Sequence, residues 1–181
     1  MSAQEWSEER IASALAMFTF RRSALVMVPN TYWTGHETDL LVVRKDLRLI
    51  DIEVKISCHD FRQDKFKDKW LVPSDYTGCS RWPAAGLVYG INEPKWPRRI
   101  WKHYYALPEI VWKNELLTHI PVTSGILWMR KRTDGSVGIH VHRNAKPNKK
   151  ADRVTLEEVI DIARACSLRY WDLKARHGEW A

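Results

Sequence analysis

The sequence has little cysteine and no long apolar run. Its three cysteines, Cys58, Cys79 and Cys166, are widely spaced and form no CxxC pair, so a disulfide framework is not expected and a reducing compartment fits better. Apolar runs such as Leu40–Val43 are far too short to cross a bilayer. The charged N-terminal stretch also lacks the apolar core of a signal peptide. We therefore expect a cytoplasmic protein that does not bind a membrane.

Two widespread catalytic signatures are missing as well. The chain has no Gly-rich phosphate loop and no G-x-S-x-G sequence, so nothing indicates a nucleotide cofactor or a serine hydrolase. What remains is a chain of 181 residues, of which 45% are hydrophobic and 28% are charged. This length and composition predict one globular domain spanning residues 1–181 and exclude a disordered or low-complexity architecture.

Positive charge exceeds negative charge. The chain has 29 Lys and Arg against 22 Asp and Glu, which gives a net charge of +7. A surplus of this size favours an anionic partner, most commonly nucleic acid, although a basic surface also serves solubility. The clustered residues that we expect to contact DNA phosphates are Arg98, Arg99, Arg130, Lys131, Arg132, Arg143, Lys149 and Lys150.

Capping boxes predict where three helices begin. The pairs that form these boxes are Ser2 with Glu5, Ser57 with Asp60, and Thr155 with Glu158. The first helix should turn Glu8 inward together with Ile11 and Leu15, and the second should run to about Trp70. The third helix carries an apolar stripe that we expect to be buried: Leu156, Val159, Ile160, Ala163, Cys166, Tyr170 and Leu173.

Strands are predicted where β-branched and apolar residues run between turn residues. The expected ranges are 24–28, 38–44, 48–56, 100–107, 126–132 and 137–143, with hairpin turns at Lys45–Asp46 and at residues 133–136. The elements therefore follow the order helix, three strands, helix, strand, hairpin and helix. This order predicts an α/β fold with a mixed central β-sheet flanked by helices.

Two acids and a lysine on neighbouring predicted strands form the strongest candidate site. Alternate side chains of a strand share a face, which puts Asp51, Glu53 and Lys55 on one side and isoleucine and valine on the other. If the preceding strand pairs with this one, Asp39 approaches Glu53. Two carboxylates and an ammonium would then meet on a rigid sheet.

This combination suits phosphodiester hydrolysis. Carboxylate oxygens bind Mg²⁺ or Mn²⁺, and such an ion polarises a phosphoryl oxygen and lowers the pKa of a bound water. The lysine can orient that water or offset the charge that develops on phosphorus. The plainer alternative is a solvated sheet face with a cross-strand Glu–Lys pair, because the chain has two other acid-x-Lys triplets, at residues 93–95 and 172–174.

Several motifs, taken in chain order, resemble the PD-(D/E)xK nuclease superfamily, and most closely its MmcB-like DNA-repair nucleases. The family pattern has an acid-led strand, an EVK strand, a helix ending in KW, and an aromatic strand. The matching segments here are Asp39–Val43, Ile52–Ser57, Asp60–Asp64, Lys69-Trp70, His103–Pro108, Ile120-Pro121 and Gly125–Leu127.

The resemblance implies a restriction-endonuclease-like core and a metal-dependent DNA nuclease. Asp39 and Glu53 would be metal ligands and Lys55 the catalytic ammonium. Superfamily members often add a further acid, and Glu8 and Glu37 compete for this role, Glu37 also as a metal ligand. Several alternatives stay open: RNA or branched DNA as the substrate, a homodimer, and a catalytically silent DNA-binding or assembly module.

The chain departs from the family pattern at residues 71–100, which separate the predicted KW helix from the aromatic strand. This segment has four prolines and three glycines, and its side chains include Arg81, Trp82 and Trp96. Aromatic and basic side chains of this kind can stack on bases and neutralise phosphates. We expect the segment either to select the DNA structure beside the site or simply to cover the edge of the core.

Overall fold

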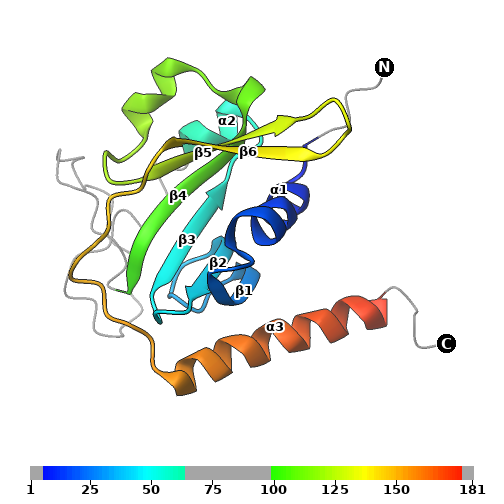
Figure 1. The fold of residues 1–181 in the computed structure, drawn as a ribbon, viewed down its shortest axis with the longest axis vertical. Helices are drawn as coiled ribbons and strands as arrows, with labels where there is room; N and C mark the ends of the chain where they lie inside the picture. Colours follow the sequence, from blue (N-terminus) through cyan, green and yellow to red (C-terminus); the bar gives the residue numbers. More distant parts are fainter. Residues whose placement is uncertain (1–5, 64–98, 177–181) are drawn as a thin grey trace, which may run out of the picture.

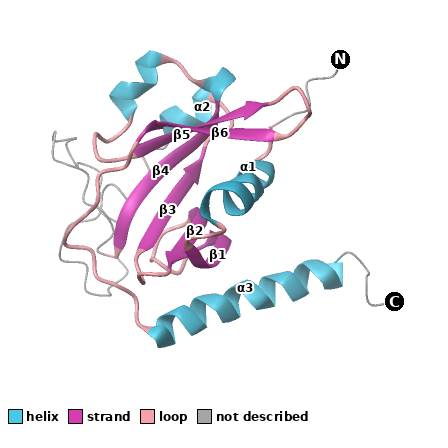
Figure 2. Ribbon diagram, viewed as in Figure 1, coloured by secondary structure: helices cyan, strands magenta, loops and turns pink. Residues whose placement is uncertain are grey.

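The computed structural model describes residues 6–63 and 99–176. They form a six-stranded mixed sheet whose strands lie side by side in chain order (Figures 1 and 2). The strands are β1 (Ala24–Thr31), β2 (Thr38–Arg44), β3 (Leu49–Val54), β4 (Ile100–Pro108), β5 (Gly125–Lys131) and β6 (Val137–Arg143). β3 runs parallel to β4 and β4 parallel to β5, whereas the other neighbours are antiparallel. The predicted α/β fold with a mixed sheet is confirmed.

β2 and β3 form the predicted hairpin. Their pairing runs from Leu40 opposite Ile52 to Val43 opposite Leu49. The turn is closed by a hydrogen bond from the Arg44 N–H to the Arg48 carbonyl. All six residues of β3 are buried, because this strand lies in the middle of the sheet with neighbours on both sides. Side chains on β3 are therefore held in a rigid setting.

β1 is longer than its predicted range of 24–28. It continues through Pro29, which pairs with Leu40, and ends at Thr31. Proline has no backbone N–H to donate, but an edge strand needs donors on one side only. β1 is such an edge strand, which explains why Pro29 does not end it.

α1 (Glu8–Ala14) begins at a different cap from the predicted one. Ser7 is its N-cap, and the Ser7 hydroxyl accepts the Arg10 N–H at 3.1 Å. The predicted pair of Ser2 and Glu5 lies outside the described residues. A π-helical turn, η1 (Leu15–Phe20), continues α1 towards β1.

One face of the sheet is covered by α1. Ile11 and Leu15 are buried against Ile52 and Val54 of β3, in a cluster that also includes Ala106 of β4. These β3 residues alternate with Glu53, so the acidic side chains of β3 point to the other face. α1 and the acids thus lie on opposite sides of the strand.

The other face carries two separate apolar clusters. One joins β2 to the C-terminal helix and includes Leu41 and Ile162. The second joins β4 to α2 (Cys58–Gln63) and to the 3₁₀ turn η5 (Asn114–His119), and it includes Phe61, Tyr105 and Leu116. Polar residues of β3 lie on this face, between the two clusters.

α2 begins where its capping signal predicts. The Asp60 N–H donates to the Ser57 hydroxyl at 3.1 Å, which is the expected N-cap contact. The predicted end of this helix near Trp70 lies outside the described residues, as does nearly all of the predicted 71–100 loop. After this interval the chain returns as β4, parallel to β3.

α3 (Leu156–Arg176) also begins at its predicted capping box. The Thr155 N–H donates to Glu158 Oε2 at 2.8 Å, and the Glu158 N–H donates to Thr155 Oγ1 at 3.2 Å. Both donors of this box are satisfied reciprocally.

The predicted buried stripe of α3 is largely wrong. The buried residue of the helix is Ile162, which the stripe omits, whereas Leu156, Ile160 and Leu173 are more than half exposed. The reason is that α3 packs mainly beside β1, and its C-terminal end extends past the strands (Figure 1). An apolar stripe becomes a core only where another element covers it.

Among residues 6–63 and 99–176, no helix combines the length and the apolar character needed to span a membrane.

Candidate functional site

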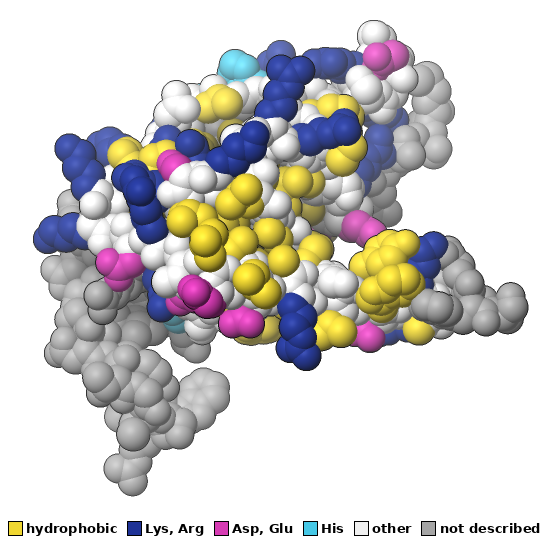
Figure 3. Space-filling model, turned by 60° about the horizontal axis from the view of Figure 1, so that its bottom comes forward, with side chains coloured by type: hydrophobic (Ala, Val, Ile, Leu, Met, Phe, Trp, Pro, Cys, Tyr) yellow, Lys and Arg dark blue, Asp and Glu magenta, His cyan; other side chains and the backbone are white. Residues whose placement is uncertain are grey.

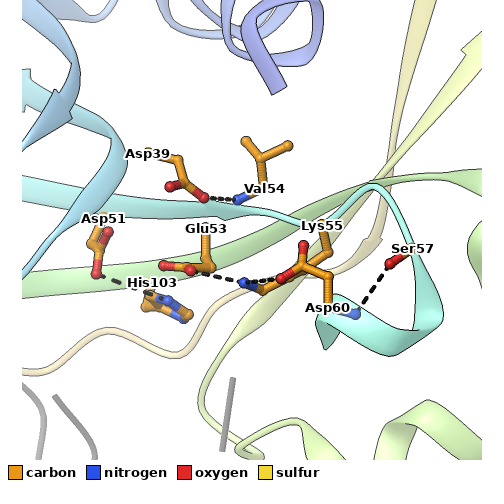
Figure 4. Close-up of polar contacts among 8 residues, drawn as sticks. All are labelled: Asp39, Asp51, Glu53, Val54, Lys55, Ser57, Asp60 and His103. Atoms are coloured by element: carbon orange, nitrogen blue, oxygen red, sulfur yellow. Dashed lines mark hydrogen bonds and ion pairs between the residues drawn. The ribbon is translucent and has the colours of Figure 1, made fainter. Parts of the chain in front are cut away.

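The β2–β3 hairpin places Asp39 next to the centre of the candidate site. Asp39 Oδ2 accepts a hydrogen bond from the backbone N–H of Val54 at 2.6 Å (Figure 4). The backbone pairing of β2 and β3 ends at the Leu40–Ile52 pair. Past that point, the Asp39 carboxylate accepts the β3 amide that a backbone carbonyl would otherwise accept. Val54 lies between Glu53 and Lys55 in the chain. The pairing of the two strands is as predicted, and it holds Asp39 beside the residue that follows Glu53; the approach of the two carboxylates to each other stays a prediction.

Glu53 of β3 and Lys55, which directly follows the last residue of that strand, form a buried ion pair. Lys55 Nζ lies 2.9 Å from Glu53 Oε1, and the two side chains are 2% and 0% exposed. A charge in such a place is costly unless it is paired and hydrogen-bonded. The predicted alternative of a solvated cross-strand pair is wrong, because the two residues are only two positions apart in the chain and both side chains are buried.

α2 supplies a second acid to the same lysine. Asp60 Oδ1 lies 3.5 Å from Lys55 Nζ, and the Asp60 side chain is 37% exposed. The same residue donates its backbone N–H to Ser57 at the helix start. The cap of α2 thereby holds an acid next to the buried ammonium, as Figure 4 shows.

A second buried polar group includes Asp51, which lies two residues before Glu53 on β3, and no sequence motif marked this group as a site. His103 of β4 lies opposite Asp51 in the parallel pairing of β3 and β4. His103 Nε2 is 3.9 Å from Asp51 Oδ2, and His103 Nδ1 is 3.1 Å from the Ser124 hydroxyl. All three residues are at most 2% exposed. The available signal was a lone histidine within an apolar strand.

The structure contradicts the inward orientation predicted for Glu8 and does not place the competing acid, Glu37, in the buried site. Glu8 is exposed and belongs to α1, whose buried side chains pack on the opposite face from Glu53. Glu37 is exposed too, and it precedes β2, which begins at Thr38. Neither acid is buried with Lys55.

The predicted phosphate-binding residues divide into two groups. Arg99 pairs with Glu158, and Arg130 pairs with Glu109 of the 3₁₀ turn η4 (Glu109–Val111). The guanidinium of Arg143 donates to the carbonyls of Ser124 and Pro121 at 2.8 and 2.9 Å. These three side chains thus hold parts of the fold together. Arg99 and Arg130 are exposed despite these ion pairs, and so are Lys131, Arg132, Lys149 and Lys150, whereas Arg98 lies outside the described residues.

Ion pairing at the edge of the sheet affects two pKa values. The Arg130 guanidinium donates to Glu109 and holds the pKa of that carboxyl below its ordinary value, whereas the pKa of Arg130 is raised. Near them His142 stacks on Trp128 with ring centroids 3.9 Å apart, and burial, followed by the charges of His140 and Arg143, lowers the pKa of His142. The His142 ring therefore packs on the Trp128 ring.

The residues at the candidate site are suited in kind to a hard divalent cation. Asp39 and Glu53 offer carboxylate oxygens, and Mg²⁺ commonly takes only one or two protein carboxylates and completes its shell with water. Within the described ranges, no group of three His, Cys, Asp or Glu side chains gathers as a ready-made metal cage. The donor set therefore fits Mg²⁺ or Mn²⁺ better than a structural zinc ion.

Comparisons with known proteins show the fold but not the activity. No family model matches the chain, and no curated protein matches it significantly. A solved structure of a protein of unknown function from Silicibacter pomeroyi superposes with a TM-score of 0.57 and 15% sequence identity. The match covers 96% of this chain and 93% of that one. The resemblance to PD-(D/E)xK nucleases stays a prediction.

Proposed function

We propose that the protein is a metal-dependent nuclease of the PD-(D/E)xK type that hydrolyses phosphodiester bonds of DNA. The observation that carries the proposal is the arrangement of Asp39 on β2, Glu53 on the paired strand β3 and Lys55 just past the end of β3. Asp39 accepts the Val54 amide, and Lys55 is paired with Glu53 in a buried setting. The order of an acid-led strand, an EVK strand and a helix agrees with the family pattern.

Asp39 and Glu53 would hold the metal ion through their carboxylate oxygens. A bound ion would supply Lewis acidity to a phosphoryl oxygen and lower the pKa of an attacking water. The Val54 N–H restrains the Asp39 carboxylate, so this ligand would need little reorganisation on binding. Preorganisation of this kind lowers the cost of both metal binding and catalysis.

Lys55 would act on the phosphate or on the attacking water. Its ammonium is held by Glu53 at 2.9 Å and by Asp60 at 3.5 Å. From this position it can donate a hydrogen bond to the water or to a phosphate oxygen that gains negative charge. Asp60 is a positioning residue in this scheme, because it acts through Lys55.

One observation favours a second candidate, the catalytically silent DNA-binding module. Lys55 is already neutralised by the acids Glu53 and Asp60. A lysine held in this way can serve as a purely structural charge. In that case the exposed basic residues Lys131, Arg132, Lys149 and Lys150 would bind DNA without cleavage.

The deciding experiment compares cleavage by the wild type and Lys55→Gln. Duplex DNA, single-stranded DNA and RNA of the same sequence are incubated with each protein in Mg²⁺, in Mn²⁺ or in a chelator. We expect metal-dependent cleavage of DNA by the wild type and its loss in Lys55→Gln. Lys174→Gln is the matched control, because Asp172-Leu173-Lys174 has the same acid-x-Lys spacing on α3.

The possible outcomes distinguish between the nuclease, the silent DNA-binding module and a different substrate. Equal cleavage by the wild type and Lys55→Gln would contradict the assignment of Lys55. Tight DNA binding without cleavage by a folded wild type would favour the silent module. Metal-dependent cleavage of RNA but not of DNA would keep the chemistry and change the substrate.

A further inference from the structure

Three segments far apart in the chain meet at one end of the sheet, away from Asp39. They are the β2–β3 turn, the start of β4 and the linker that leads from β6 to α3, which Figure 1 shows together. The Asn148 N–H of the linker donates to the Trp101 carbonyl at 2.7 Å, and the Val154 N–H donates to the Leu47 carbonyl at 2.9 Å. These hydrogen bonds fix the three segments relative to one another.

Three cationic side chains surround the indole of Trp101 at this end. The guanidinium carbons of Arg44 and Arg48 lie 4.7 and 5.0 Å from the ring centroid, and Lys102 Nζ lies 4.8 Å from it. Each distance falls within the range of a cation–π contact. Three such contacts on a single ring bring three positive charges close together, where they repel one another.

The described residues provide one acid against these three cations. Asp46 Oδ1 lies 3.1 Å from Arg44 Nε, which leaves a local surplus of two positive charges. Burial, and after it the charge of Arg44, lowers the pKa of Lys102. A bound anion would relieve that repulsion.

Two buried hydrogen-bond donors lie in the same cluster. The Nε of Arg48 and the Nε1 of Trp101 are buried, and the described part of the chain offers neither an acceptor. Buried donors are nearly always satisfied in native proteins, by the protein itself, by water or by a ligand. Donors without acceptors and uncompensated positive charge thus coincide at one place.

We propose that Arg44, Arg48 and Lys102 form, around Trp101, a binding site for a phosphate dianion. The local surplus of two charges matches a dianion, and guanidinium groups bind phosphate oxygens in a bidentate manner. The ligand is inorganic phosphate or the terminal phosphate of a larger molecule, since both present the same group.

This site is separate from the candidate nuclease centre. Arg44 is five residues from Asp39 along β2, which corresponds to about 17 Å in an extended strand. Trp101 packs against the apolar cluster that α1 covers, on the opposite face from Glu53. The proposal therefore does not depend on nuclease activity, and either can fail alone.

The test is ¹⁹F NMR of the full chain labelled with 5-fluorotryptophan, in which each of the ten tryptophans carries one fluorine atom. The Trp101 resonance is assigned with Trp101→Phe, which keeps an aromatic ring. Inorganic phosphate is titrated against a chloride background at constant pH and ionic strength. An oligonucleotide with a 5′-phosphate and the same oligonucleotide without it are titrated in parallel.

We expect phosphate to shift the Trp101 resonance in a saturable manner. Arg48→Gln and Lys102→Gln should each weaken binding by about tenfold, the loss expected for one charge-assisted hydrogen bond. Lys113→Gln should leave binding unchanged, because Lys113 is an exposed lysine that follows another tryptophan, Trp112.

The oligonucleotide comparison identifies the source of the phosphate. Tighter binding of the 5′-phosphorylated oligonucleotide than of inorganic phosphate would assign the site to nucleic-acid ends. Binding of inorganic phosphate alone would assign it to the free anion. No saturable shift with any ligand would overturn the proposal, and so would unchanged affinity in Lys102→Gln, which tests the site even if Arg48→Gln does not fold.

Discussion

Asp39 accepts the backbone N–H of Val54 with a separation of 2.6 Å between Oδ2 and the amide nitrogen. The acceptor is a side chain, and the donor belongs to the residue between Glu53 and Lys55. One hydrogen bond thus ties the acid of β2 to the segment that carries Glu53 and Lys55. Both the stability of the hairpin and the geometry of the candidate site depend on it.

Removing this acceptor should destabilise the protein. Val54 is buried, so Asp39→Ala would leave its N–H without the Asp39 acceptor and should lower the free energy of unfolding by about 1–3 kcal/mol. Asp39→Asn keeps a carbonyl oxygen at the same place and should cost less. Urea unfolding of the two variants measures the difference, and equal losses would show that the hydrogen bond contributes little.

Metal binding should depend on the charge of Asp39. If Mg²⁺ or Mn²⁺ binds the folded protein and not the unfolded chain, it raises the melting temperature by mass action. Asp39→Asn should lose most of that rise while its metal-free form stays folded. Asp46→Asn, in the β2–β3 turn, serves as the control and should keep the rise. A full metal-induced rise in Asp39→Asn would place the ion elsewhere.

Removing one partner of the Glu53–Lys55 pair should lower the free energy of unfolding far more than replacing both partners with apolar residues. Lys55→Met leaves a buried carboxylate that has lost its nearest cation, and breaking a buried pair in this way typically costs about 3–5 kcal/mol. The double variant Glu53→Leu with Lys55→Met removes both charges and should cost markedly less. Denaturant unfolding of Glu53→Leu, of Lys55→Met and of the double variant gives the coupling energy between the two charges. Additive losses would mean that the two charges act independently.

Two isoleucines of α3 should behave in opposite ways. Ile162 is 1% exposed and Ile160 is 66% exposed. Ile162→Ala should therefore lower the free energy of unfolding by about 2–5 kcal/mol, and Ile160→Ala should change it by less than about 0.5 kcal/mol. The same chemical change on one helix makes each variant the control of the other. A large loss from Ile160→Ala would show that this side of α3 is covered in solution.

The capping box of α3 should make stability depend on pH. The Thr155 N–H and then Arg99 hold the pKa of the Glu158 carboxyl below its ordinary value. Since the folded pKa is the lower one, this stabilisation is complete above the unfolded pKa and is lost as the pH falls through the folded pKa. Glu158→Gln should thus have a lower free energy of unfolding than the wild type near neutral pH. Urea unfolding at a series of pH values should show this gap between the two proteins closing in acid. A gap that is constant with pH would contradict this account.

Local features of the sequence were sufficient for the order of the elements and for part of the site. The β2–β3 hairpin, the caps of α2 and α3 and the shared face of Glu53 and Lys55 follow from turn residues, capping residues and the two-residue period of a strand. All of these act over a few neighbouring residues. They can therefore be recognised without knowing what lies next to them in space.

Contacts between distant segments depended on the tertiary structure. His103 meets Asp51 because β4 pairs in parallel with β3 after a long interval in the chain, and such a register leaves no local signal. Trp101 lies beside Arg44 and Arg48 only because the start of β4 pairs with the start of β3, next to the β2–β3 turn. The apolar residues of α3 show the same limit, since periodicity marks a face of a helix whereas burial requires a partner that covers it.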